Sequence, residues 1–276
     1  MKDRHAVRVV LLGCGTVGSQ VLTLPRQQAD ELAERIGARL ELVGVAVRDT
    51  ARVREVPIDP TLLTTDAASL VAREDVDIVI ELIGGIDPVR GWLTTALKRG
   101  TSVVTANKAL LANDAAVLHD AALSGGADLY YEAAVAGAIP LVRPLRESLH
   151  GDRISRVIGI VNGTTNYILS AMNETGAGFA ECLAKATELG YAEADPAADV
   201  DGHDAAAKAA IIASLAFHTR VSAAQVYTEG IRAITSDDIA SATVLGCTIR
   251  LLCIAERIRG GAKPTVTASA CGCTRR

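Results

Sequence analysis

The feature that most constrains the fold is a glycine-rich turn near the N-terminus. The mostly apolar run 7–12 ends at Gly13, and further glycines follow at Gly15 and Gly18. A short apolar run bounded by glycine predicts a buried strand, and the residues from Val17 onward predict a helix. Gly13 permits the tight turn, Gly15 lets the backbone approach a pyrophosphate, and Gly18 lets the helix pack closely on the strand. A strand, this turn and a helix N-terminus predict a phosphate-binding loop.

The remainder of the first half alternates predicted strands with predicted helices. We expect strands at 40–47, 76–83, 102–105 and 129–133, and helices at 17–37 (interrupted by Pro25), 88–99 and 109–123. This β-α-β alternation is typical of a parallel sheet with helices on both faces. With the glycine turn, it predicts an α/β fold, namely a Rossmann-type doubly wound parallel sheet that binds NAD(P) over residues 1–140.

The pattern changes near Leu141. A strand is expected at 154–161, and helices at 165–174, 179–189, 204–217 and 236–259, the last capped by Ser236. Residues 141–259 therefore form a second, mostly helical α+β domain for substrate binding and dimerisation, which we expect to be incomplete. Residues 260–276 show no apolar period and are expected to be an irregular tail, as at a truncated or frame-shifted end.

Composition excludes several classes of protein. Hydrophobic residues make up 49% of the chain but aromatics only 3%, so the core consists of small side chains. A net charge of -4 argues against nucleic-acid or anionic-membrane partners. No apolar run approaches the roughly 20 residues of a membrane span, and the run 7–12 is too short for a signal peptide, so a cytoplasmic protein is expected. The six cysteines fit neither a disulfide framework nor a zinc site and are expected to be mainly core residues.

Candidate chemistry comes from a few charged residues. Arg48 follows the second strand, where it would stack on adenine or hold the 2′-phosphate of NADP. The adjacent Asp49 would instead favour the ribose 2′-hydroxyl of NAD. We predict NADP, with NAD as the alternative. Only six of the 28 basic residues are lysines, and lysine, unlike arginine, can exchange its proton. Lys208 lies four residues after Asp204 in an Ala-rich helix, which predicts a largely buried ion pair.

Two further groups could hold a ligand. An acidic cluster could bind a divalent metal or the ammonium group of an amino acid, or could be a solvated loop; it comprises Glu193, Asp195, Asp199 and Asp201. A glycine-containing turn after the fifth strand offers the Glu132 carboxylate and nearby backbone carbonyls, which suit a hard cation.

Several motifs occur in a fixed order. They are Ile83-Gly84-Gly85, Thr105-Ala106-Asn107-Lys108, Tyr131-Glu132-Ala133-Ala134-Val135-Ala136-Gly137-Ala138-Ile139-Pro140, Asn162-Gly163-Thr164-Thr165-Asn166-Tyr167-Ile168, Gly190-Tyr191-Ala192-Glu193-Ala194-Asp195-Pro196 and Asp199-Val200-Asp201-Gly202-His203-Asp204-Ala205-Ala206-Ala207-Lys208. Together with the phosphate loop, this set closely resembles homoserine dehydrogenase over residues 7–259. The combination is far more specific than any single motif.

The resemblance implies an oxidoreductase that reversibly reduces L-aspartate 4-semialdehyde to L-homoserine with NAD(P)H, a reaction of threonine and methionine biosynthesis. It implies that Lys208 donates the proton and that Lys108 assists between nicotinamide and substrate. The substrate would be held by Glu193, Asp204 and Asp199. The cofactor would be bound by Gly13, Gly15, Thr16, Val17, Gly18, Arg48, Lys108 and Gly190. A monovalent cation, usually sodium, would be bound by Glu132, Val135, Gly137 and Ile139. A homodimer formed through the second domain is also implied.

Two other functions compete with this one. The first is a catalytically inactive NADP-binding fragment of the same family. The second is a different Rossmann oxidoreductase such as an aspartate-semialdehyde dehydrogenase, which needs a cysteine nucleophile and a base. Cys14 lies inside the phosphate loop and Cys182 in a predicted helix without an evident partner, so the second is disfavoured.

Overall fold

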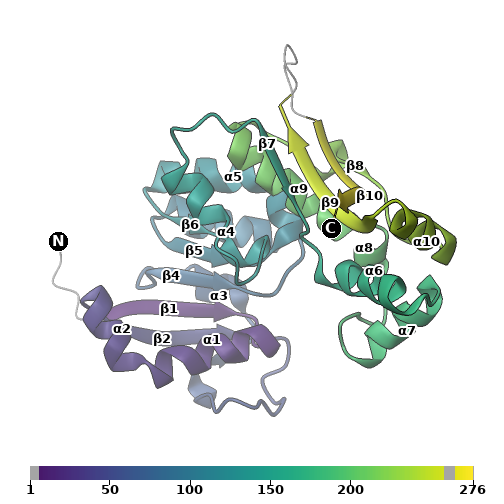
Figure 1. Ribbon diagram of the computed structural model, residues 1–276. Helices are drawn as coiled ribbons and strands as arrows, with labels where there is room; N and C mark the ends of the chain where they lie inside the picture. The colour runs from purple at the N-terminus through teal and green to yellow at the C-terminus, as the bar shows by residue number, and fades with distance from the viewer. Residues whose placement is uncertain (1–5, 258–264, 276) are drawn as a thin grey trace. The chain divides into compact units, whose positions relative to one another are not determined.

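The computed structural model describes residues 6–257 and 265–275, and it divides the chain into two compact units, Met1–Ala134 and Val135–Arg276 (Figure 1). Each unit has its own sheet and its own core. Among the described residues, no helix combines the length and apolar character needed to cross a membrane.

The first unit contains a six-stranded sheet in the order β3-β2-β1-β4-β5-β6, in which all neighbouring strands are parallel. The strands are β1 (Ala6–Leu12), β2 (Arg39–Ala46), β3 (Leu63–Thr64), β4 (Ile78–Glu81), β5 (Ser102–Thr105) and β6 (Leu129–Tyr130). The predicted Rossmann-type sheet is confirmed. The strand order reverses between β1 and β4, and in such sheets ligands bind at the carboxyl ends beside this switch point.

Helices connect these strands, as the alternating pattern predicts. They are α1 (Thr16–Gln27), α2 (Ala29–Ile36), α3 (Ala67–Val71), α4 (Val89–Lys98) and α5 (Lys108–Gly125), with a 3-10 turn at Pro60–Leu62. The predicted helix 17–37 is indeed interrupted, but at Gln28 rather than at Pro25, which lies inside the last turn of α1. The short elements β3 and α3 escape prediction because neither is long enough to show a period.

The second unit packs helices against a four-stranded mixed sheet of order β7-β9-β10-β8 (Figure 1). Its strands are β7 (Arg156–Gly159), β8 (Tyr227–Thr228), β9 (Cys247–Glu256) and β10 (Thr265–Arg275). Its helices are α6 (Gly163–Thr175), α7 (Phe179–Glu188), α8 (Ala197–Val200), α9 (His203–Phe217) and α10 (Ser236–Val244), with short turns at Pro144–Ser148 and Ala223–Gln225. The 3-10 turn Glu132–Ala134 ends the first unit. The central helix α9 packs on β9 and β10 and buries most of its alanines and isoleucines.

Two predictions for the C-terminal part are wrong. The helix predicted over 236–259 ends at Val244; Gly246 follows with φ +69° and β9 begins at Cys247. Within β9, Leu251, Cys253 and Ala255 are buried alternately, which is the period of a strand and not of a helix. The number of apolar residues in this segment is compatible with a helix or a strand. It is a strand because it pairs with β7 and β10.

The predicted irregular tail is wrong over 265–275, which form β10 between β9 and β8. Val266 and Ala268 are buried while Thr265 is exposed, so a two-residue alternation is present here. This alternation is hard to recognise in the sequence because threonine and alanine differ little in apolar character. The predicted segment 260–264 lies outside the described residues. Of the four cysteines whose burial is described, Cys182 and Cys253 are buried core residues as expected, whereas Cys14 and Cys247 are half-buried.

Candidate active site

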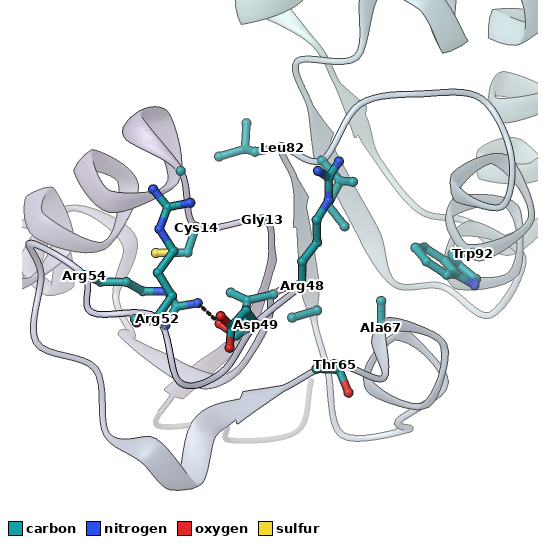
Figure 2. A pocket seen from close by; sticks show the side chains of 14 residues that line it. Gly13, Cys14, Arg48, Asp49, Arg52, Arg54, Thr65, Ala67, Leu82 and Trp92 are labelled. Atoms are coloured by element: carbon teal, nitrogen blue, oxygen red, sulfur yellow. Dashed lines mark hydrogen bonds between the residues drawn. The ribbon is translucent and has the colours of Figure 1, made fainter.

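A cleft of about 420 Å³ opens at the carboxyl ends of β1, β2 and β4 in the first unit (Figure 2). Its lining comes from the glycine turn, from the segment after β2, from the segment after β4 and from α3 and α4. The lining residues are Gly13, Cys14, Gly15, Ala46, Val47, Arg48, Asp49, Arg52, Arg54, Thr65, Ala67, Leu82, Ile83 and Trp92. The cleft therefore lies beside the switch point of the sheet, where dinucleotides bind in folds of this kind.

The glycines of the turn are required by their surroundings. Gly13 has φ +96°, and a Cβ at this position would lie 2.9 Å from the carbonyl oxygen of Leu82. A Cβ on Gly18 would lie 2.3 Å from the carbonyl oxygen of Gly13. The predicted turn and close-packing roles of these two glycines are thus confirmed. Nothing lies within 4 Å of a Cβ built on Gly15, so its face is open, and its contact with a pyrophosphate stays a prediction.

The first turn of α1 is available to a ligand. Gly15 is its N-cap, no side chain caps the helix, and Thr16 and Val17 are exposed. Uncapped backbone N–H groups and the positive end of the helix dipole favour an anion at this place. The first unit therefore supplies the elements of a phosphate site.

The turn after β2 carries three arginines and one acid. Arg48 and Asp49 are exposed at the cleft. Asp49 Oδ1 accepts a hydrogen bond from the Ala51 amide at 2.9 Å, so this oxygen is engaged within the turn. Arg54 donates to the carbonyl oxygens of Asp49 and Arg52 and shapes the turn, whereas Arg48 and Arg52 supply positive charge at the cleft.

A buried ion pair lies in the second unit. Lys208 Nζ is 2.7 Å from Asp204 Oδ2, and the two side chains are only 13% and 8% exposed. The pair predicted from the four-residue spacing is confirmed. Lys208 Nζ also donates to the carbonyl oxygen of Val161 at 2.6 Å. The ammonium group is thus held at a defined place by one carboxylate and one carbonyl.

Asn162 connects this pair to a second acid. Its side chain is nearly buried, and its Nδ2 donates to Asp199 Oδ1 at 2.6 Å and to Asp204 Oδ2 at 3.0 Å. Its Oδ1 accepts from the Thr165 amide at 2.9 Å and so caps α6. Sequence reasoning gave Asn162 no role: an Asn before a helix indicates a cap, but no local signal links it to acids 37 and 42 positions away.

The rest of the predicted acidic cluster is separated. Asp201 pairs with Arg232, whose guanidinium lowers the pKa of that carboxyl. Asp195 accepts from the Ala197 amide at 3.1 Å, and Glu193 is exposed. In the part of the chain that the structure describes, no group of three or more His, Cys, Asp or Glu side chains is placed to hold a metal ion.

The other predicted site residues are distributed between the two units. Lys108 is exposed at the start of α5 in the first unit, whereas Gly190, with φ +77°, follows α7 in the second. Glu132 lies in the 3-10 turn that ends the first unit. The other three residues of the predicted cation site, Val135, Gly137 and Ile139, belong to the second unit. Val135 is buried, Gly137 has φ +61°, and Ile139 is 67% exposed. A site shared by Lys108 and Lys208, and a cation site made of all four residues, stay predictions.

Comparison with known proteins decides the family. The model "Homoserine dehydrogenase, NAD binding domain" matches residues 13–132, and the model "Homoserine dehydrogenase" matches residues 140–271. The crystal structure of a putative homoserine dehydrogenase from Archaeoglobus fulgidus has 33% sequence identity and a TM-score of 0.82, and the match covers 95% of this chain and 84% of that one. The chain belongs to the homoserine dehydrogenase family. The match to 271 also corrects the expected end of the resemblance at 259.

Other members of the family are more similar in sequence but longer. The homoserine dehydrogenase of Mycobacterium tuberculosis (strain H37Rv) is 60% identical over 256 residues, which are 93% of this chain and 58% of that protein. The structure of the Thiobacillus denitrificans enzyme has 42% identity and a TM-score of 0.88, with 95% of this chain and 60% of that one covered. This chain thus spans about 58% of the length of the M. tuberculosis protein.

Proposed function

We propose that this protein is an NADP-dependent homoserine dehydrogenase, which interconverts L-aspartate 4-semialdehyde and L-homoserine. The observation that carries the proposal is the hydrogen-bonded, partly buried cluster of Asn162, Asp199, Asp204 and Lys208 in a chain of this family. It offers one proton-carrying ammonium group and two carboxylates in fixed positions. The first unit of the same chain has the glycine turn and open helix N-terminus of a dinucleotide site.

Lys208 is the proposed proton donor. Reduction of the aldehyde places negative charge on the carbonyl oxygen, and a proton from Lys208 Nζ would convert this oxygen to the hydroxyl of homoserine. In the reverse direction the amine takes the hydroxyl proton. The bonds of Nζ to Asp204 and to the Val161 carbonyl support this role because they orient the group. Lys108 is proposed to lie between nicotinamide and substrate and to assist the proton transfer.

The carboxylates are proposed to hold the amino-acid part of the substrate. Asp199 would receive its ammonium group, with Glu193 and Asp204 as the other contacts. Asn162 supports this arrangement because one side-chain amide restrains both Asp199 and Asp204. Opposite charge recognises the amino acid, and the fixed geometry places its aldehyde carbon for reaction.

The cofactor is proposed to be NADP, with NAD as the alternative. The pyrophosphate would lie against Gly13, Gly15 and Gly18 and the amides of Thr16 and Val17, and Gly190 would contact the cofactor from the second unit. Arg48 would bind the 2′-phosphate; the cluster of arginines after β2 and the engagement of Asp49 Oδ1 within its own turn support this choice. When bound, the cofactor supplies the hydride.

The assay that tests the proposal is steady-state homoserine oxidation with NADP⁺ and NAD⁺ in parallel, beside a fluorescence titration of the chain with NADPH. We expect turnover with homoserine that is faster with NADP⁺ than with NAD⁺. NADPH binding without turnover would instead support the inactive NADP-binding fragment. No binding of either cofactor would contradict both functions.

A monovalent cation, sodium in this proposal, would be bound by the Glu132 carboxylate and the carbonyls of Val135, Gly137 and Ile139. One carboxylate and three carbonyl oxygens form a donor set that suits a hard cation of low charge. We expect replacement of sodium by tetramethylammonium, which is too large to enter such a set, to lower homoserine oxidation at least about threefold and the melting temperature by about 2 °C or more. Equal activity and equal melting in both salts would contradict the site.

A homodimer formed through the second unit is also proposed. One row of side chains crosses all four strands of its sheet, because Ile158 pairs with Ile254, Ile254 with Thr267, and Thr267 with Tyr227. Ile158 and Tyr227 are 47% and 62% exposed, whereas Cys253, Ala255 and Ala268 on the opposite face are buried. An exposed apolar sheet face of this kind supports pairing with a second copy of the chain.

The dimer is tested by Ile158→Glu, which places a charge in the exposed row. We expect a dimer for the wild type and a monomer for this variant in sedimentation velocity, because a charge left without a partner at the centre of an interface weakens association strongly. The matched control is Ile36→Glu, an equally exposed isoleucine at the end of α2 in the other unit, which should leave the mass unchanged. A monomeric wild type, or a dimeric Ile158→Glu, would contradict the proposed face.

A further inference from the structure

Glu81, the last residue of β4, has a fully buried carboxylate. Its Oε1 accepts hydrogen bonds from the amides of Ile83 and Gly84, both at 2.8 Å. Its Oε2 accepts from the hydroxyl of Thr105 at 2.6 Å. These three donors are neutral, and a carboxylate that only accepts hydrogen bonds is satisfied by them in its ionised form. Among the described residues no cationic side chain pairs with Glu81, so a negative charge balanced only by neutral donors lies at the carboxyl end of β4.

The Glu81 carboxylate is held by the loop after β4 and the loop after β5, which hydrogen bonds join to each other. Thr105 Oγ1 also accepts from the Asn107 amide at 3.0 Å, and Asn107 Nδ2 donates to the Gly85 carbonyl at 2.6 Å. Asn107 in turn caps α5. Glu81, Thr105 and Asn107 thus tie the loop after β4 to the loop after β5, so the charge is fixed relative to both.

The position of this charge matters for a dinucleotide. In the order β3-β2-β1-β4-β5-β6, β4 and β5 lie on the side of β1 opposite to β2. In folds of this kind the segment after β2 binds the adenosine half of the cofactor, so the nicotinamide half would extend over the ends of β4 and β5. Ile83, whose amide Glu81 holds, lines the cleft. The buried charge therefore lies beneath the nicotinamide end.

We propose that Glu81 sets the preference of the site for the oxidation state of its cofactor. The nicotinamide ring of NADP⁺ carries a positive charge that the ring of NADPH lacks, so a fixed negative charge nearby attracts the oxidised form selectively. Glu81 acts through its charge, at a place that the two loops fix, and is a positioning residue. The inference rests on the proposed binding of a nicotinamide cofactor.

Glu81→Gln in the full chain tests the inference, because glutamine keeps the shape and one carbonyl acceptor for the two amides but removes the charge. The dissociation constant of NADPH is measured by fluorescence titration and that of NADP⁺ by competition. We expect the dissociation constant of NADP⁺ to rise about tenfold and that of NADPH less than about twofold. The ratio of the two constants then changes by the amount expected for one buried unit charge acting over roughly 10 Å. The matched control is Asp59→Asn, an exposed carboxylate that also accepts from a threonine amide and hydroxyl and should leave the ratio unchanged.

The outcomes separate the inference from the function on which it rests. Equal weakening of both forms by Glu81→Gln, or an unchanged ratio, overturns the inference while the cofactor site stands. A wild type that binds neither form overturns the proposed cofactor site and the inference together. If Glu81→Gln does not fold, Thr105→Val carries the test, since it removes the hydroxyl that donates to Glu81 and accepts from the Asn107 amide but keeps the charge of Glu81. The ratio should then stay within about twofold of wild type, and a tenfold shift would show that loop geometry sets the ratio and would overturn the inference.

Discussion

Replacement of Lys208 by alanine is expected to lower homoserine oxidation about a thousandfold, within the range for loss of a general acid, and to change NADPH affinity less than about twofold. The first effect follows from the loss of the proton donor. The second follows from the place of the phosphate loop in the other unit of the chain. Stopped-flow turnover and NADPH titration on the same preparation measure both quantities.

Lys208→Ala also removes the cation beside the Asp204 carboxylate, which keeps its hydrogen bond from Asn162, and this loss should destabilise the second unit by several kcal/mol. Lys208→Arg separates the two effects. Arginine keeps a positive charge beside Asp204 but does not release a proton, so this variant should melt close to the wild type and still lose turnover. Lys185→Ala, an exposed lysine paired with Glu188 on α7, is the control and should remain active. An active Lys208→Arg, or equal loss of cofactor binding and turnover in Lys208→Ala, would refute the assigned role.

Gly18→Ala is expected to weaken cofactor binding at least about tenfold, which corresponds to about 1.4 kcal/mol. The added Cβ would lie 2.3 Å from the carbonyl oxygen of Gly13, so backbone must move. Either α1 shifts away from β1 or the turn opens, and both displace the amides that would hold the pyrophosphate. The strain should also destabilise the first unit by about 1–3 kcal/mol, as overpacked cores do.

Gly91→Ala provides the matched control for this substitution. Gly91 lies inside α4, and a Cβ built there meets nothing within 4 Å. Alanine is the better helix former, so the variant should be as stable as the wild type or more stable by up to about 1 kcal/mol. Cofactor titration and thermal melting of the two variants measure the difference. Unchanged NADPH binding by Gly18→Ala would show that the turn is not the phosphate site.

The parts of the fold that were predictable are those with a strong local pattern. Buried parallel strands such as β1 are short apolar runs, and the helices between them are long enough to show their period, so the first unit follows from the sequence almost element by element. The Asp204–Lys208 pair was predictable for the same reason, since four residues are one helical turn.

The parts that escaped prediction depend on pairing between distant segments. The run 247–256 could be helix or strand by composition, and it is a strand because β7 and β10 lie on either side of it. Thr265 and its successors have little apolar contrast, yet they complete the same sheet. For both segments, hydrogen bonds to other strands outweigh the weak local preference.

The sequence by itself determined the glycine turn, the parallel sheet and the ion pair, because each depends on residues within a few positions of one another. The tertiary structure alone decided that Asn162 restrains Asp199 and Asp204, and that Glu81 is buried beneath two loops joined through Thr105. These contacts join residues more than 20 positions apart, and a buried polar group takes its partners from whichever segments the fold brings to it. Short-range pattern therefore set the glycine turn, whereas the fold as a whole set which buried polar groups face one another.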